Sequence, residues 1–280
     1  MRTLPIIPIV YLCMALIMVA MTTVAGVDTL KERKYAEGGG PEVEVLEVEE
    51  GRPIVRIKNF LPAGTASKLL RALRGKKRRW VFATNEGNRK IKSNDNIEGR
   101  REISRRKMES GAFAYAKFEL DSQRERLYNK IWKMFSSKKV RKKISLALAA
   151  AENGHAPAVR GITDLFVAKY AQGDFLSPHN DAFGGSITFI LNLTPKWRNG
   201  MGGHLDFFCK SNSTWCHSER PTWNSLLIFR SRPASITHRV NMVQHGERFS
   251  ITGWYLDDKD VWTEEDEAQC SAMRSGLPCT

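Results

Sequence analysis

The chain has 280 residues, which suffices for one large domain or two small ones. This length excludes the class of small proteins that cannot bury a sufficient hydrophobic core. Its formal net charge is +14, and Lys and Arg are concentrated between Arg71 and Lys143. Such a surface either contacts a polyanion or an acidic protein substrate, or is a solvated face, and we favour the solvated face.

The N-terminus is apolar: residues 4–27 contain no charged side chain. We therefore interpret residues 1–27 as a secretory signal peptide or a signal anchor. Small residues at 23–26 suit cleavage, and the run is also long enough to span a membrane, so both interpretations stay open. Either one places the rest of the chain in the secretory pathway, in the lumen of the endoplasmic reticulum or Golgi. There we expect no nucleic-acid partner, and membrane contact only through this segment.

Residues 28–51 precede the first globular segment and contain GGGPEVEVLEVEEG, which we interpret as a linker or stem with little capacity to form a core. Residues 52–160 are predicted to be a helical, basic supporting region that begins with one alternating strand, 53–61. Helices are expected in three places within it: from Pro62 to Gly75, around Leu127, Ile131 and Met134, and over residues 142–152.

Residues 161–257 have a different texture, with short apolar or alternating segments separated by Gly, Pro, Asn and Ser. Strands are predicted at 165–171, 186–193, 203–208, 224–231, 238–243 and 248–256. Their number and spacing favour a closed or double-sheet antiparallel jelly roll, so the expected fold class is mainly β with flanking helices, α+β. The remaining residues, 258–280, form an acidic tail that contains two cysteines.

Four of the five cysteines lie outside the N-terminal run, and an oxidising lumen favours their pairing. Two short-loop disulfides are predicted, Cys209–Cys216 and Cys270–Cys279. The first pair has an alternative use, because a zinc ion could be bound by His204, Cys209, Cys216 and His217. The spacing of those four residues is irregular, and lumenal thiols tend to oxidise, so we favour the disulfide.

Two His-x-Asp triplets are candidate metal sites: HND at His179 and Asp181, and HLD at His204 and Asp206. In a strand, residues i and i+2 share a face, so spacing alone excludes neither. His238 begins another predicted strand and can add a third ligand to HND. Two imidazoles and one carboxylate are the facial ligand set of non-haem Fe(II) oxygenases, which leaves positions for a co-substrate and O2. HLD has no such partner pattern, and we assign the metal to HND.

The co-substrate 2-oxoglutarate, bound to iron through its keto acid end, needs a fixed cation for its remote carboxylate. Arg248 lies ten residues after His238, within one strand–turn–strand unit, and a guanidinium suits bidentate carboxylate binding. Ser250, at i+2 on the same face, adds a hydroxyl donor. Tyr170 can donate its phenol to the same ligand.

These motifs carry a family resemblance. The runs YAQGDFLSPHND, ITFILNLTPKW, GGHL, WNSLLIF, THRV and RFSITGWY, over residues 163–256, resemble the prolyl 4-hydroxylase-type 2-oxoglutarate/Fe(II)-dependent dioxygenases, in particular the SM-20-like or prolyl hydroxylase branch. The resemblance implies a double-stranded β-helix with helices outside it. It also implies that His179, Asp181 and His238 bind iron, that Arg248 holds 2-oxoglutarate, and that Tyr170 is a second contact.

The expected activity is hydroxylation of a substrate C–H, a peptidyl proline by resemblance, with release of succinate and CO2. The implied cofactors are Fe(II), 2-oxoglutarate and O2, with ascorbate as reductant, and the implied partner is a protein or peptide. Two alternatives stay open. One is the same chemistry on a non-prolyl side chain or a small molecule, and the other is a non-catalytic module that binds a polyanion or protein.

Overall fold

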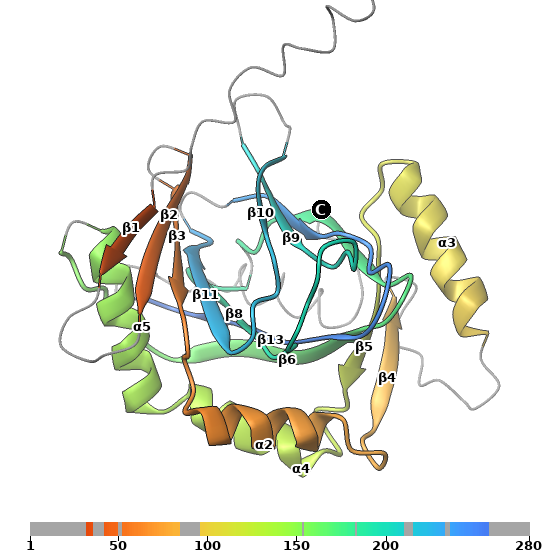
Figure 1. Ribbon diagram of the computed structural model, residues 1–280, viewed down its shortest axis with the longest axis horizontal. Coiled ribbons are helices and arrows are strands. Elements are labelled where there is room, and N and C mark those ends of the chain that lie inside the picture. The colour runs from red at the N-terminus through yellow and green to blue at the C-terminus, as the bar shows by residue number, and fades with distance from the viewer. Residues whose placement is uncertain are drawn as a thin grey trace, which may run out of the picture. The chain divides into compact units, whose positions relative to one another are not determined.

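The chain folds around one antiparallel sheet of thirteen strands that curls into a jelly-roll barrel (Figure 1). The computed structural model describes residues 32–35, 42–49, 52–84, 96–152, 154–182, 184–209, 215–232 and 236–257. The strand order is β1-β2-β3-β11-β8-β13-β6-β5-β7-β12-β9-β10, and β4 pairs with β5. The predicted fold class, mainly β with flanking helices, is confirmed.

The strands are β1 (Glu32–Tyr35), β2 (Val43–Glu49), β3 (Arg52–Ile57), β4 (Trp80–Thr84), β5 (Tyr115–Leu120), β6 (Ile162–Tyr170), β7 (Phe175–His179), β8 (Ile187–Asn192), β9 (Leu205–Phe208), β10 (Trp215–Glu219), β11 (Ser225–Arg230), β12 (His238–Val240) and β13 (Arg248–Tyr255). The helices are α2 (Ala63–Leu73), α3 (Ile97–Glu109), α4 (Arg126–Phe135) and α5 (Lys138–Ala151). Within the described part of the chain, no helix has both the length and the apolarity to cross a membrane.

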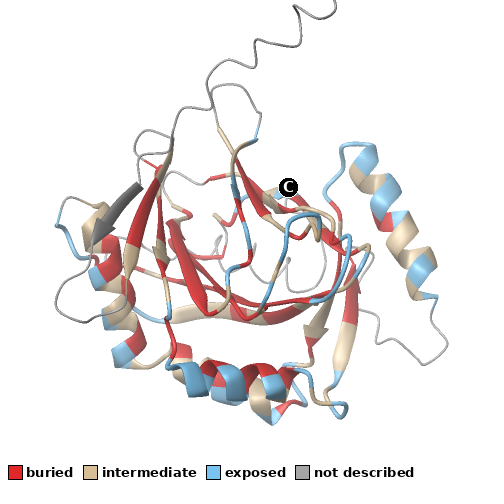
Figure 2. Ribbon diagram, in the orientation of Figure 1, coloured by how far each residue is buried: buried red, intermediate tan, exposed pale blue. Residues whose placement is uncertain are grey.

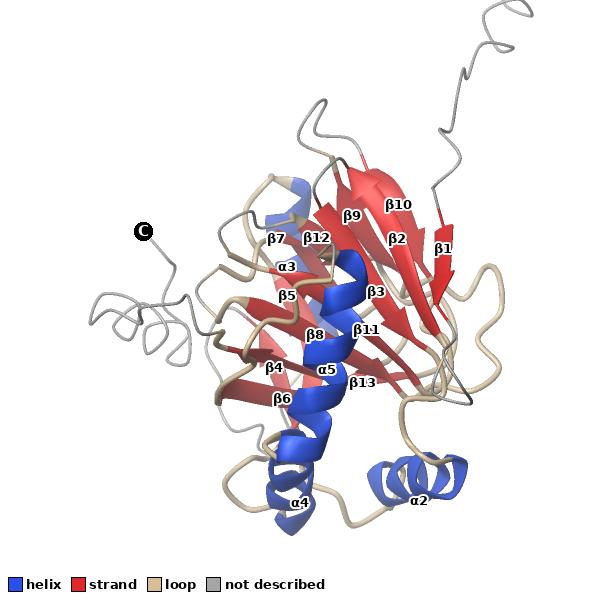
Figure 3. Cartoon of the chain, turned by 90° about the vertical axis from the view of Figure 1, so that its left-hand side faces the viewer, coloured by secondary structure: helices blue, strands red, loops and turns tan. Residues whose placement is uncertain are grey.

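The outer face of the wide part of the sheet is covered by α2, α4 and α5 (Figures 1 and 3). Phe135 at the end of α4 stacks on Phe189 of β8 with 4.4 Å between ring centroids, and its carbonyl accepts a hydrogen bond from the Tyr255 hydroxyl. The side chains that these helices bury repeat at helical spacing, for example Ala66, Leu69, Leu70 and Leu73 in α2.

The inner face of the sheet holds a second core. Alternate residues of β11 separate the two layers: Leu226 and Ile228 pack under the helices, whereas Leu227 and Phe229 point into the barrel. Every residue of β8 is buried, as Figure 2 shows for the central strands. A strand that is covered on both faces reads as a continuous apolar run, and this explains the sequence ITFILN.

Buried ion pairs close the barrel between β3 and β10. Arg56 of β3 donates to Glu219 of β10 across 2.5 Å and to Glu44 of β2 across 2.6 Å. Both carboxylates are almost fully buried, and Lys58 also pairs with Glu44. Removing one member of such a group would leave an uncompensated buried charge, at a cost of about 3–5 kcal/mol.

The interpretation of residues 28–51 as a linker or stem is wrong where the structure describes them. This segment supplies β1 and β2, and β2 pairs with β3 along its length. The alternation in VEVLEVE was a strand pattern, and Val45 and Leu46 are buried. The glutamates suggested a solvated stem, but Glu44 is buried because Arg56 and Lys58 neutralise it.

Residues 52–160 contain the predicted helices together with elements that were not predicted. The expected helices exist as α2, α4 and α5, and α5 begins at Lys138, four residues before the predicted start, because Ser137 caps it. Three elements were not predicted: β4, β5 and α3. The strand β10 was also missed.

The disulfide Cys209–Cys216 is present, with 5.7 Å between the Cα atoms, and it joins the ends of β9 and β10. This pairing confirms the first predicted bridge and removes both sulfurs from the alternative zinc site. The second predicted bridge, Cys270–Cys279, lies outside the described residues, as do the N-terminal apolar run and the acidic tail.

Helix α3 is attached to the barrel wall through one buried ion pair. Arg101 of α3 donates to Asp174 across 2.7 Å, and its guanidinium lies 5.4 Å from the centre of the Phe82 ring. Asp174 is fully buried in the turn between β6 and β7 and also accepts a hydrogen bond from the Ala171 amide. The turn that leads to His179 is therefore tied to α3.

Asp174 should make stability depend on pH. Burial raises the pKa of Asp174 to about 6, although the Ala171 amide and Arg101 oppose the rise. Since the folded pKa exceeds the unfolded value, the contribution of this group is full below about pH 4 and is lost as pH rises through 6. Asp174→Asn should therefore gain stability relative to the wild type between pH 4 and 7, by roughly 3 kcal/mol. Urea unfolding at both pH values measures this, and a difference that does not change with pH would contradict it.

Candidate metal centre

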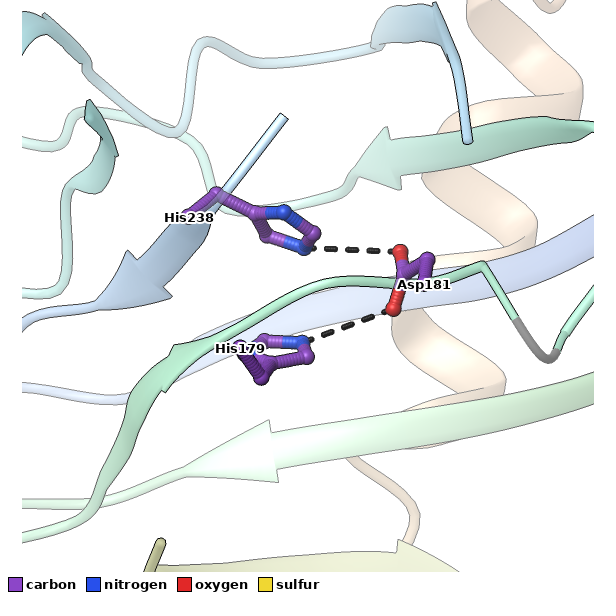
Figure 4. A group of neighbouring side chains, drawn as sticks. All are labelled: His179, Asp181 and His238. Carbon is purple, nitrogen blue, oxygen red and sulfur yellow. Dashed lines mark ion pairs between the residues drawn. The ribbon is translucent and has the colours of Figure 1, made fainter. Parts of the chain in front are cut away.

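Two antiparallel strands bring the candidate ligands together. His179 ends β7 and His238 begins β12, and the two residues are direct partners in the strand register. Their ring centroids are 4.3 Å apart. Asp181 lies two residues beyond His179 and points back at both rings (Figure 4). The triad thus combines one sequence-local pair with one residue from far along the chain.

The three side chains surround a space of the size of a metal ion. Their ligand atoms all lie within 4.8 Å of one another. His179 Nε2 is 3.5 Å from Asp181 Oδ1, and His238 Nε2 is 3.4 Å from Asp181 Oδ2 (Figure 4). Within the described residues this is the one group of three or more His, Cys, Asp or Glu side chains close enough to share a metal.

Backbone contacts determine which ring nitrogen faces the metal position. His179 Nδ1 lies 2.9 Å from the Ser177 carbonyl oxygen, and His238 Nδ1 lies 2.9 Å from the Ile236 carbonyl oxygen. A carbonyl can only accept, so each Nδ1 must carry the proton. Each Nε2 then presents its lone pair toward Asp181, which is the tautomer that a metal ligand requires.

The electrostatics of the triad favour a cation at its centre. Burial acts to raise the pKa of Asp181, but His238 and His179 outweigh it and hold this pKa well below its ordinary value. Burial and the neighbouring His238 lower the pKa of His179. The pKa of His238 is raised because Asp181 outweighs the effect of burial. An ionised carboxylate between two imidazoles fits a divalent metal ion.

The surroundings of the triad are apolar on the inner side and open on the other. The His238 ring lies 5.0 Å from the Phe229 ring and 6.0 Å from the Phe207 ring, and only 3% of its side chain is exposed. His179 is 18% exposed and contacts the ring of Phe113. The His179 side of the triad is therefore the more accessible to solvent, and the His238 side is covered by aromatic rings.

The rival triplet has a structural role. Asp206 is buried and accepts hydrogen bonds from Ser218, Arg239 and Asn241. It pairs with Arg239 in the register, while its neighbour Phe207 pairs with His238. Asp206 therefore faces away from the side that His238 occupies. Spacing could not separate HLD from HND, but strand register does.

The predicted anion clamp lies on the same inner face of the barrel. Arg248 of β13 and Tyr170 of β6 are direct partners, and the guanidinium lies 5.2 Å from the centre of the Tyr170 ring. Ser250, two residues on, is buried opposite Asn192 of β8. Asn192 accepts a hydrogen bond from Arg248 Nη2 at 3.4 Å. These four side chains come from three adjacent strands.

Arg248 is available for an anion. It is almost fully buried, its Nε has no hydrogen-bond partner, and within the described residues it forms no ion pair with a carboxylate. Burial lowers the pKa of Arg248. A buried guanidinium whose bonding capacity is unmet is costly unless an acceptor arrives, so the position suits a ligand carboxylate.

Two polar residues of the site were not predicted. Thr188 of β8 donates from Oγ1 to Asp181 Oδ2 at 3.0 Å and so orients the carboxylate. Asn192 lies four residues further along the same strand, beside Arg248. The signal was present, because Thr188 and Asn192 are the polar positions of the run ITFILN and share one face.

Known proteins are similar to the part of the chain that carries these site residues. Residues 165–256 match the family described as the 2OG-Fe(II) oxygenase superfamily. The prolyl 3-hydroxylase OGFOD1 of Mus musculus is 37% identical over 99 residues, which is 33% of this chain and 18% of that protein. The Xenopus laevis protein of the same name is 33% identical over 98 residues, 33% of this chain and 19% of its own. The chain thus spans about a fifth of the length of these curated relatives.

Two solved structures are also similar. A prolyl-4-hydroxylase from Pseudomonas putida is 19% identical with a TM-score of 0.37, and the match covers 68% of this chain and 97% of that one. A Trichoplax adhaerens prolyl hydroxylase, in complex with a peptide fragment of the hypoxia inducible factor oxygen degradation domain, is 21% identical with a TM-score of 0.44. That match covers 77% of this chain and 86% of the other.

Thr188 provides a test of the metal centre that leaves the three ligands in place. Thr188→Val should weaken binding of Mn(II) by about tenfold to a hundredfold, since loss of a group that orients a ligand has this effect. Titration of the metal-free protein with Mn(II) measures the affinity. Thr252→Val is the matched control, because Thr252 is buried on the neighbouring strand β13. Equal Mn(II) affinity in the Thr188 variant and the wild type would contradict the assignment.

Proposed function

We propose, from the membership of residues 165–256 in the 2OG-Fe(II) oxygenase superfamily, that the chain is an Fe(II)- and 2-oxoglutarate-dependent hydroxylase. The observation that carries the proposal is a pair of sites on one inner face. One is the metal triad, in which two unprotonated imidazole nitrogens face an ionised carboxylate. The other is the buried Arg248, whose Nε has no hydrogen-bond partner. A non-catalytic barrel would not need both.

Each residue has a distinct role in this proposal. His179, Asp181 and His238 would hold the iron, and their backbone and Thr188 contacts keep the ligand atoms oriented. When bound, iron and 2-oxoglutarate supply the oxidising chemistry that uses O2 to hydroxylate a C–H bond and releases succinate and CO2. The protein contributes orientation, a dry cavity wall behind His238, and an opening beside His179.

Arg248 would bind the carboxylate of 2-oxoglutarate that is remote from the iron. Tyr170 and Ser250 lie on the same face and present hydroxyls beside it. Burial raises the pKa of Tyr170, so its phenol stays protonated and can donate. The spacing of Arg248 after His238 in the sequence suggested this role for Arg248.

The proposed substrate is a peptidyl proline in a protein or peptide. Support comes from the two relatives named prolyl 3-hydroxylase and from the opening beside His179, where the exposed Phe113 offers an apolar surface. The same iron chemistry could act on another side chain or on a small molecule. Comparing turnover with proline-containing peptides and with non-prolyl substrates separates these cases.

We further propose that the enzyme works in the secretory pathway and uses ascorbate as its reductant. The apolar residues 4–27 and the disulfide Cys209–Cys216 support an oxidising compartment. Ferrous iron is prone to oxidation in such a compartment, and a reductant would keep the metal in the Fe(II) state. Processing of the N-terminus in secreting cells, read from the mass of the mature protein, tests the location.

The activity itself can be tested with the full chain, Fe(II), 2-oxoglutarate and ascorbate. Succinate should form together with a hydroxylated product when proline-containing peptides are added. His179→Ala should reduce this turnover more than a hundredfold, because one metal ligand is lost. His204→Ala is the matched control from the rival triplet and should retain turnover. Coupling to a non-prolyl substrate alone would overturn the proline assignment, and equal turnover in the His179 variant would overturn the iron site.

Arg248 gives a separate test of co-substrate binding. Arg248→Met should raise the KM for 2-oxoglutarate by about tenfold to a hundredfold, because a charge-assisted hydrogen bond to a buried group is lost. Iron affinity should stay near that of the wild type, because Arg248 belongs to a different part of the barrel face. Steady-state kinetics at varied 2-oxoglutarate measures the change, and an unaltered KM would show that the carboxylate binds elsewhere.

A further inference from the structure

One buried cation on the inner face has no role in the function proposed so far. Lys117 lies in β5, outside the segment that matches the oxygenase family, and only 6% of the residue is exposed. Burial opposes its charge, but the pKa of Lys117 is nevertheless raised by Glu119, Tyr170 and Tyr115. The ammonium is therefore charged inside the barrel, where an isolated charge is costly.

Strand register places Lys117 beside the co-substrate clamp. Phe118 of β5 pairs with Lys169 of β6, and so the adjacent residues Lys117 and Tyr170 oppose each other on the inner face. Tyr170 pairs in turn with Arg248 on its other side. A row across β5, β6 and β13 thus contains Lys117, Tyr170 and Arg248 in that order, with a cationic residue on each side of Tyr170.

Contacts of the Lys117 ammonium hold it over the barrel interior. Nζ lies 3.7 Å from the centre of the Phe166 ring and 5.4 Å from the centre of the Tyr115 ring. Its ion-pair partner among the described residues is Glu119 at 3.0 Å, and 29% of the Glu119 side chain is exposed. An ammonium has three donors, so Glu119 leaves capacity for a further acceptor.

The position of the ammonium indicates what that acceptor is. 2-Oxoglutarate has two carboxylates, and a buried ammonium on the same inner face as Arg248 can donate a further charge-assisted hydrogen bond to it. Resting on the proposed function, we propose that Lys117 is a second cationic contact for 2-oxoglutarate, and that Glu119 competes with the co-substrate for the ammonium. If Lys117 were only a partner of Glu119, changes at either residue would leave co-substrate affinity as it is.

Equilibrium binding tests this without turnover. The full chain is loaded with Mn(II) and titrated with 2-oxoglutarate in a calorimeter. Lys117→Met should raise the Kd by about tenfold or more, because one charge-assisted contact is lost. Glu119→Gln should lower the Kd, because the competing carboxylate is gone. The matched control is Lys169→Met: Lys169 lies on the opposite face of the same sheet, 4.6 Å from the Phe118 ring, and pairs with Glu247.

The outcomes separate this inference from the function on which it rests. If the Mn(II)-loaded wild type does not bind 2-oxoglutarate, the proposed function fails and the inference fails with it. If the wild type binds and Lys117→Met binds equally well, only the role of Lys117 is overturned. If Lys117→Met does not fold, Lys117→Arg and Glu119→Gln decide: a Kd that the Glu119 variant leaves unchanged or raises overturns the inference.

Discussion

The pairing of β7 with β12 is the constraint on which the site depends. It sets His179 directly opposite His238, although the two residues lie far apart in the chain. The backbone carbonyls of Ser177 and Ile236 each accept a hydrogen bond from one imidazole, which keeps the proton on Nδ1, and both Nε2 atoms face Asp181. The two imidazoles are thus oriented by main-chain groups, which a substitution of neighbouring side chains leaves in place, whereas the Asp181 carboxylate is oriented by the Thr188 hydroxyl. A slip of one residue in this register would turn one imidazole to the other face.

Polar side chains form a row on the inner face of the barrel, and apolar side chains surround them. Phe207, Phe229 and Leu227 exclude water from one side, and Arg248, Asn192 and Ser250 line the other. Buried polar groups are costly when they lack partners, so an interior with an unpaired guanidinium nitrogen is best explained by a ligand. Lys117 is buried on the same face, and its charge is held by Glu119 and lies over two aromatic rings.

Charged residues also hold the barrel closed at a distance from the site. The Arg56 group joins β3 to β10, and Asp174 joins the β6–β7 turn to α3. The basic character of residues 71–143 is therefore only partly a solvated face. Arg78 pairs with Glu125, and Lys143 donates to the Phe60 carbonyl. Several of the positive charges that the sequence displays are bonded within the fold.

The sequence by itself determined the strand-rich half, the three helices at 3.6-residue spacing and the ligand types, because period-two and helical patterns and His-x-Asp spacing are local properties. It could not show that Glu44 is buried, because its partners Arg56 and Lys58 lie in and directly after the next strand, although the alternation of residues 43–49 was itself a strand pattern. The His-x-Asp spacing alone did not separate HND from HLD, and the sequence favoured HND only through its partners His238 and Arg248. Only the tertiary structure decided that Asp181 shares a face with His238 and Asp206 does not, because strand register is a relation between distant segments.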